Sequence, residues 1–109
     1  MTTVRLSPAA KEDIKRIRTY ICEELGNKTS AKNVIDRMID SMRQLEQFHM
    51  MGAALSSVIE PETDYRFLVS GSYLIFYRIE KNCVYVDRIL YGKRDYLKIL
   101  FKDTADLDS

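Results

Sequence analysis

Several features that would indicate a particular class of protein are absent from this sequence. No run of apolar residues approaches the ~20 that a membrane-spanning helix needs, and the N-terminal residues lack the apolar segment of a signal peptide. The two cysteines have no spacing typical of a metal site. The net charge is only +1, unlike that of a polycationic nucleic-acid-binding protein. We therefore expect a cytoplasmic protein with reduced thiols, no cofactor and no membrane association.

The length and composition indicate one domain. With 109 residues, of which 46% are hydrophobic and 30% charged, the chain can bury a single core without disulfides or metals. It has no repeat, no low-complexity segment and no internal boundary. We therefore expect one domain over residues 1–109, with the acidic residues 103–109 forming a disordered tail.

The first residues predict a strand and then a helix. Residues Thr3–Leu6 alternate in polarity, which suits a short strand at the edge of a sheet. Ser7 and Pro8 are typical of a helix start. Apolar residues then recur every three or four positions as far as Leu25, which predicts an amphipathic helix. Asp13 lies near its start, where we expect an acidic side chain to interact favourably with the helix dipole.

A second helix follows closely. Gly26 and Asn27 tolerate the left-handed conformation that ends a helix, so we expect the first helix to end there. Thr29 or Ser30 is the predicted cap of the next helix, whose apolar stripe continues to Leu45. Because the link is short, the two helices should form an antiparallel hairpin.

The second half of the chain predicts a sheet. Residues 48–64 are irregular and are expected to be a mobile connection. Short turns at residues 70–72 and 80–82 then separate three runs rich in aromatic and β-branched residues. These runs are the predicted strands Tyr65–Val69, Tyr73–Ile79 and Val84–Leu90. A short helical turn at Asp95–Phe101 completes an α+β fold of order β-α-α-β-β-β.

Positive charge is concentrated after the last predicted strand. Between Arg88 and Lys102 there are five basic residues and one acidic residue. Gly92 ends the strand, and Lys93 and Arg94 follow it directly. A local basic patch in a nearly neutral protein indicates either an anionic partner or an ordinary solvated surface.

Two segments carry a resemblance to a known family. The sequence IFYR at residues 75–78, followed by RILYGKRD at residues 88–95, resembles the RelE/ParE superfamily of bacterial type II toxin–antitoxin toxins. The resemblance extends from Val4 to Phe101. It implies a small antiparallel sheet with the helical hairpin packed on one face. It also implies a cognate antitoxin that holds the toxin inactive, and operator DNA bound through that antitoxin.

The superfamily contains two activities. RelE-like members cleave mRNA in the ribosomal A site, whereas ParE-like members poison DNA gyrase. The resemblance implies that RelE-like nucleases carry cations at positions where this chain has Leu74 and Leu68. If the chain were such a nuclease, its implied catalytic residues would be Arg66, Arg94 and Tyr96. Because that set is incomplete, the ParE-like branch is favoured, with the ribosome-dependent endoribonuclease as the alternative and an inactive relic as a third possibility.

Strand alternation predicts where an antitoxin would bind. We expect Leu68, Leu74 and Phe76 to share one face of the sheet, because side chains alternate along each strand. An exposed apolar face of this kind marks an interface, so these three residues form the predicted antitoxin-binding site. Phe67 and Ile75 are expected to face the helices instead.

The basic cluster is the predicted target-binding site. We assign this role to Arg88, Tyr91, Lys93 and Arg94, with Arg94 as the central residue. The expected function is growth arrest by a plasmid-stabilising toxin that acts on DNA gyrase.

Overall fold

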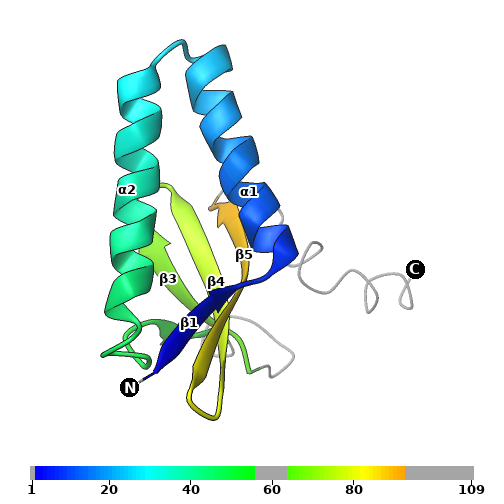
Figure 1. The fold of residues 1–109 in the computed structure, drawn as a ribbon, viewed down its shortest axis with the longest axis vertical. Coiled ribbons are helices and arrows are strands. Elements are labelled where there is room, and N and C mark those ends of the chain that lie inside the picture. Colours follow the sequence, from blue (N-terminus) through cyan, green and yellow to red (C-terminus); the bar gives the residue numbers. More distant parts are fainter. Residues whose placement is uncertain (1, 56–63, 93–109) are drawn as a thin grey trace, which may run out of the picture.

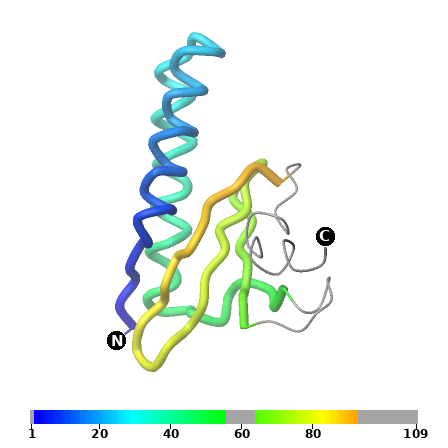
Figure 2. Tube along the Cα trace, turned by 90° about the vertical axis from the view of Figure 1, so that its right-hand side faces the viewer, coloured from blue at the N-terminus to red at the C-terminus, as the bar shows by residue number. Residues whose placement is uncertain are grey.

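A helical hairpin packs on one face of a five-stranded sheet in the computed structural model, which describes residues 2–55 and 64–92. The helices lie on one side of the sheet, and the connected end of the hairpin extends beyond it (Figures 1 and 2). This arrangement confirms the predicted α+β fold. In chain order the elements are β1 (Thr3–Leu6), α1 (Pro8–Thr19), the π-helical turn η1 (Tyr20–Glu24), α2 (Lys28–Gln44), β2 (Ala53–Ala54), β3 (Arg66–Ser70), β4 (Tyr73–Glu80) and β5 (Cys83–Tyr91).

Local side-chain contacts define the hairpin. The Ser7 hydroxyl oxygen accepts a hydrogen bond from the Ala10 amide at 2.9 Å, which confirms Ser7 as the first cap. Gly26 adopts φ +63° and ends the first helical segment. The predicted cap of α2 was wrong, because Asn27 occupies that position and its side chain accepts from the Ser30 amide at 2.9 Å. Because the chain reverses at Gly26, α2 begins at Lys28, before the cap that was predicted at Thr29 or Ser30.

The sheet has the strand order β1-β5-β4-β3-β2. Strands β3, β4 and β5 form the predicted antiparallel meander, and each lies within two residues of its expected bounds. Strand β1 pairs in parallel with β5, with Thr3 opposite Cys83. The predicted antiparallel sheet is confirmed for β3, β4 and β5, whereas β1 joins its edge in parallel. The helical hairpin crosses one face before the chain returns, which gives β1 the direction of β5.

The described part of the connection between helices and sheet contains a hydrogen-bonded turn and a short strand, which corrects the expectation of an irregular segment for residues 48–55. The Met51 amide donates to the Phe48 carbonyl at 2.9 Å and closes a turn. Strand β2 then pairs with β3, with Ala53 opposite Phe67. Residues 56–63 lie outside the described residues.

The two faces of the sheet carry different clusters. The main core joins the helices to the sheet and includes Met38, Met42, Ile75, Tyr77 and Val86. A second cluster on the other face contains Leu55, Phe76 and Leu90, with the half-buried Phe67 and Leu74 against it.

The predicted antitoxin-binding set is divided between these faces. Leu68 packs against the helix-side core, whereas Leu74 and Phe76 belong to the second cluster, and Phe76 is fully buried. The prediction was wrong in register: Leu68 lies opposite Ile75, and Phe67 lies opposite Phe76. A shift of one residue exchanges the two faces of a strand, so Leu68 and Phe67 change places relative to the expectation.

Candidate binding groove and the predicted site residues

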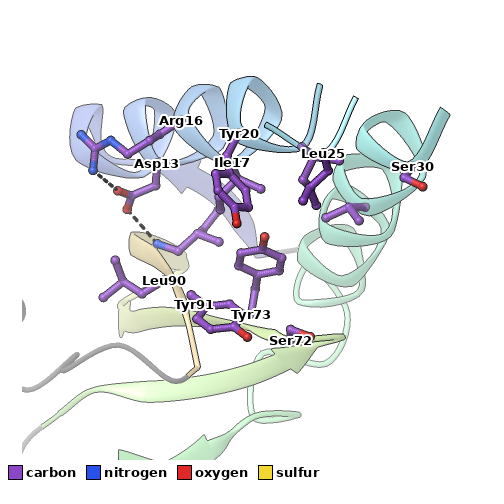
Figure 3. A pocket seen from close by; sticks show the side chains of 13 residues that line it. Asp13, Arg16, Ile17, Tyr20, Leu25, Ser30, Ser72, Tyr73, Leu90 and Tyr91 are labelled. Carbon is purple, nitrogen blue, oxygen red and sulfur yellow. Dashed lines mark hydrogen bonds and ion pairs between the residues drawn. The ribbon is translucent and has the colours of Figure 1, made fainter. Parts of the chain in front are cut away.

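An apolar groove of about 650 Å³ opens between the hairpin and the sheet. Tyr20 and Leu25 line it from the hairpin, and Tyr73 and Tyr91 line it from the ends of β4 and β5 (Figure 3). Tyr20 is 52% exposed and Leu25 is 62% exposed, although both are large apolar side chains. The groove can therefore receive apolar side chains of a partner molecule.

Strand pairing positions the sheet side of this groove. Tyr73 lies opposite Tyr91, and their rings meet edge to face with centroids 5.8 Å apart. The Gly92 amide donates to the Ser72 carbonyl at 2.8 Å, which closes the pairing just beyond the two rings. Burial raises the pKa of the Tyr73 hydroxyl, and the neighbouring Tyr91 and Tyr20 contribute in the same direction. This wall of the groove therefore consists of two aromatic rings that carry hydroxyl groups.

A buried carboxylate lies at another part of the groove. Asp13 is 3% exposed and accepts hydrogen bonds from Arg88 Nε at 2.7 Å, Arg88 Nη2 at 2.8 Å and the Ile89 amide at 2.9 Å. The hydrogen bond to Asp13 raises the pKa of the Arg88 guanidinium. Asp13 thus joins α1 to β5, a role beyond the helix-dipole interaction that its sequence position predicts.

A β-bulge accompanies this contact. Phe76 lies opposite Arg88 and Tyr77 lies opposite Val86, so Asp87 is the additional residue on β5. The Asp87 carboxylate accepts from Arg78 Nε at 2.8 Å, while the preceding and following residues continue the sheet. Two successive residues of β5 are therefore engaged in separate ion pairs.

The predicted target-binding residues have different environments. Arg88 is committed to Asp13, whereas Tyr91 is 38% exposed and lines the groove. Lys93 and Arg94 lie outside the described residues, as do the predicted C-terminal helical turn and tail. The structure therefore brings Tyr91 and the Arg88–Asp13 pair to one region of the fold.

The predicted catalytic residue Arg66 makes contacts with the backbone. Its Nη2 atom donates to the Met50 carbonyl at 3.1 Å and also to the Gly52 carbonyl. Arg94 and Tyr96, the other two members of that set, lie outside the described residues. The guanidinium of Arg66 therefore holds the residues that follow α2.

Sequence reasoning missed the hairpin side of the groove. Tyr20 and Leu25 lie at the end of the first helical segment. In the sequence, Leu25 ends the apolar stripe of the first helix, and Tyr20 was assigned no role. The available signal was Tyr20, a large aromatic residue beside the apolar stripe rather than within it. Within residues 2–55 and 64–92, no group of three or more potential metal-ligating side chains occurs, and no helix could span a membrane.

Comparisons with known proteins identify the family. Residues 4–96 match the family model described as the ParE toxin of the type II toxin–antitoxin system parDE. The fold is similar to a chain of the chromosomal ParDE toxin–antitoxin system from P. aeruginosa, with a TM-score of 0.71 and 17% identity over 85% of this chain and 98% of that one. YafQ from E. coli strain BL21(DE3) has a TM-score of 0.46 and 13% identity, over 93% and 99% of the two chains.

A search of curated proteins gives no match. The family match covers most of the chain, and the fold agrees with it. Membership implies a cognate antitoxin as a partner. The chain belongs to the ParE toxin family of type II toxin–antitoxin systems.

Proposed function

We propose that this toxin arrests growth by binding DNA gyrase, and that its antitoxin neutralises it by occupying the groove between the hairpin and the sheet. The observation that carries the antitoxin site is the exposure of Tyr20, Leu25 and Tyr91 around a hollow of about 650 Å³. A hollow with exposed apolar side chains suits an inserted segment of a partner.

Gyrase is the proposed target because the chain is a member of the ParE family. Two further observations support action by binding. Leu68 and Leu74 are packed in apolar clusters at positions where the nuclease branch carries cations. Arg66, the cation retained on that sheet, is hydrogen-bonded to backbone carbonyls.

The antitoxin site is tested by a double variant, Tyr20→Ser/Leu25→Ser. We expect it to bind the cognate antitoxin roughly 30-fold more weakly, the loss that accompanies truncation of an interface hot spot. The matched control is Val69→Ser, because Val69 is 60% exposed on β3 and lies outside the groove lining. Titration calorimetry measures both affinities, and an unchanged affinity of the double variant would contradict the assignment.

The target is tested with purified gyrase and relaxed plasmid. The toxin should inhibit supercoiling and trap gyrase on cleaved DNA, and its induction in cells should activate the DNA-damage response. Codon-specific cleavage of ribosome-bound mRNA, with gyrase unaffected, would contradict the proposal and support the endoribonuclease alternative.

Target binding at the basic cluster remains part of this proposal. Arg94, with Lys93 and Tyr91 close to it in the sequence, would engage the target through charge-assisted contacts. Removing one such contact from a desolvated interface costs about 2–5 kcal/mol. Arg94→Ala should therefore lose growth arrest while still binding antitoxin in a pull-down. A variant that still arrests growth would show that the site is misplaced.

A further inference from the structure

Strand β5 is longer than the strand that flanks it at the edge of the sheet. Strand β1 pairs with β5 only as far as Leu6, which lies opposite Val86. Strand β5 continues to Tyr91, whereas the chain that follows β1 enters α1. Among the residues that the structure describes, no strand therefore lies beside residues 87–91 on the side where β1 ends.

The hydrogen bonds to β4 show which backbone groups of β5 face this open edge. The Gly92 amide donates to the Ser72 carbonyl at 2.8 Å, so the backbone groups of Gly92 face β4. Successive residues of a strand direct these groups to opposite sides, so those of Tyr91 and Ile89 face the open edge. The Ile89 amide agrees with this assignment, because it donates to the Asp13 carboxylate of α1 at 2.9 Å.

The Asp13 carboxylate satisfies only part of this edge. It takes the Ile89 amide and leaves the Ile89 carbonyl and the Tyr91 amide, which face the same side. Neither of these two groups has a hydrogen-bond partner within residues 2–55 and 64–92. A free acceptor and a free donor on a sheet edge form a template for a further strand.

The two free groups select the direction of an added strand. In parallel pairing, one residue of the incoming strand donates to a carbonyl and accepts from the amide two positions later. The Ile89 carbonyl and the Tyr91 amide form such a set. In antiparallel pairing, a residue opposite Ile89 would need both of its backbone groups, and Asp13 already holds the amide. The edge therefore favours a strand that runs parallel to β5, in line with β1.

This open edge borders the apolar groove. Ile89 and Tyr91 line the groove together with Ile17 and Tyr20 of the hairpin (Figure 3). In a parallel strand, the residue bonded to both free groups lies opposite Leu90, and its two neighbours lie opposite Ile89 and Tyr91. Because side chains alternate along a strand, those two neighbours point towards the helices, as Ile89 does. Apolar side chains at these two positions would fill the groove.

A second copy of the toxin fits this edge poorly. Two identical edges related by a twofold axis pair as antiparallel strands. Such a pair could use both backbone groups at Tyr91 but not at Ile89, whose amide is bonded to Asp13. A segment of the antitoxin has no such restriction, because it can enter the groove in the parallel direction. Membership of the ParE family implies that this partner exists.

We propose that a segment of the cognate antitoxin adds a strand parallel to β5, in which one residue bonds both the Ile89 carbonyl and the Tyr91 amide. This inference deepens the proposed function and rests on it, since it describes how the occupant of the groove is held. The added strand continues the line of β1, and its apolar side chains lie in the groove. Main-chain hydrogen bonds then contribute affinity, and the groove contributes selectivity for side chains.

Amide hydrogen exchange of the full-length toxin, alone and saturated with the cognate antitoxin, tests the added strand. We expect exchange of the Tyr91 amide to slow by roughly 100-fold or more in the complex. The control is the Val69 amide at the opposite edge of the sheet. The Leu55 amide donates to the Tyr65 carbonyl, so alternate residues of β3, including Val69, face that edge. Exchange at Val69 should change by less than about threefold.

Nuclear magnetic resonance couplings across hydrogen bonds test the direction of the strand. In the labelled complex, a single antitoxin residue should couple to the toxin through both the Tyr91 amide and the Ile89 carbonyl. Only parallel pairing gives one residue both bonds. Two different antitoxin residues on these groups would overturn the parallel strand.

A proline at residue 91 tests the contribution of the amide to affinity. Tyr91→Ala is the matched control, because both variants lose the ring and only Tyr91→Pro loses the donor. Proline suits this position, since the nitrogen faces an open edge. We expect Tyr91→Pro to bind the antitoxin roughly tenfold more weakly than Tyr91→Ala does. Equal affinities of the two folded variants would overturn the inference. If circular dichroism shows that Tyr91→Pro is unfolded, exchange and couplings in the wild type decide.

The remaining outcomes separate this inference from the proposed function. Tight antitoxin binding without slower exchange at Tyr91 would overturn the added strand, while weak binding by Tyr20→Ser/Leu25→Ser would still support the groove. Normal binding by that double variant, with the Tyr91 amide protected, would overturn the groove assignment but support the main-chain contact. Slow exchange at Tyr91 in the free toxin, with a dimer in size-exclusion chromatography, would assign the edge to self-association and overturn the inference.

Discussion

The groove and the turn of residues 48–51 both expose apolar side chains, but they are built differently. The groove lies between two layers, with Tyr20 and Leu25 on one side and Tyr91 on the other, so its width depends on how the hairpin sits against the sheet. The turn is a local structure whose shape depends on hydrogen bonds from Tyr77 and Arg66. The groove is therefore sensitive to contacts between layers, whereas the turn is sensitive to a few atoms beneath it.

The largest effect is expected from Asp13→Ala, which removes a contact between the layers. The substitution leaves Arg88 and the Ile89 amide without their acceptor. Removing one partner of a buried ion pair costs about 3–5 kcal/mol, and we expect about 3 kcal/mol because the Arg88 side chain is 25% exposed. Urea unfolding measures this loss. The control Glu12→Ala, whose side chain is 65% exposed, should change the free energy of unfolding by less than about 0.5 kcal/mol.

Gly52→Ala should have the next largest effect, because it forces a methyl group between the turn and the sheet. Its Cβ would contact the Phe67 carbonyl and the Tyr77 hydroxyl. Overpacking of this kind costs about 1–3 kcal/mol. Ala53→Ser, at an exposed position of the adjacent strand β2, is the control. A Gly52→Ala protein as stable as wild type would show that the turn moves away from the sheet without cost.

Tyr77→Phe is expected to destabilise the fold by about 1–2 kcal/mol, since it leaves the buried Gly52 amide without its acceptor. The ring still fills the core, so the effect should be concentrated in the turn. Hydrogen exchange should therefore accelerate at Gly52 while the groove retains its affinity for antitoxin. Tyr85→Phe on β5 is the matched control. Equal acceleration at Gly52 and in α1 would show that the two regions are not independent.

The smallest effect on stability is expected from Leu25→Ser at the rim of the groove. Leu25 is 62% exposed, so its loss should change the free energy of unfolding by less than about 0.5 kcal/mol. Thermal unfolding should show a midpoint close to that of wild type. A large drop in the midpoint would mean that Leu25 supports the hairpin rather than a partner interface.

Much of the fold follows from local patterns in the sequence. The strands β3, β4 and β5 are apolar runs bounded by turns, and Gly71 at φ +58° occupies one of those turns. Ser7 and Pro8 define the start of α1 for local reasons as well. Register was harder to predict, because a two-residue turn at Gly71 and Ser72 places Leu68 opposite Ile75. If the turn is instead taken as the three residues 70–72, the pairing of the two strands shifts by one residue. Each side chain of β3 is then assigned to the opposite face of the sheet.

The site depends on contacts that no local pattern reveals. Asp13 and Arg88 are far apart in the chain, and neither has a sequence signal that names its partner. The same holds for Tyr77, whose aromatic ring predicts a strand residue but whose hydroxyl supports a distant turn. The groove also requires the position of the hairpin on the sheet, which results from packing of the whole core.

Strand β1 has a consequence for synthesis of the toxin on the ribosome. Its partner β5 begins at Cys83, so the nascent chain must extend well past that residue before β1 can pair. Strands β4 and β5 follow each other in the sequence, so they can pair as soon as both have emerged. Docking of β1 closes the longest loop in the described fold, and such pairings form slowly. A chain that lacks β5 therefore cannot complete the sheet, which delays folding of this sheet until β5 has been translated and has emerged from the ribosome.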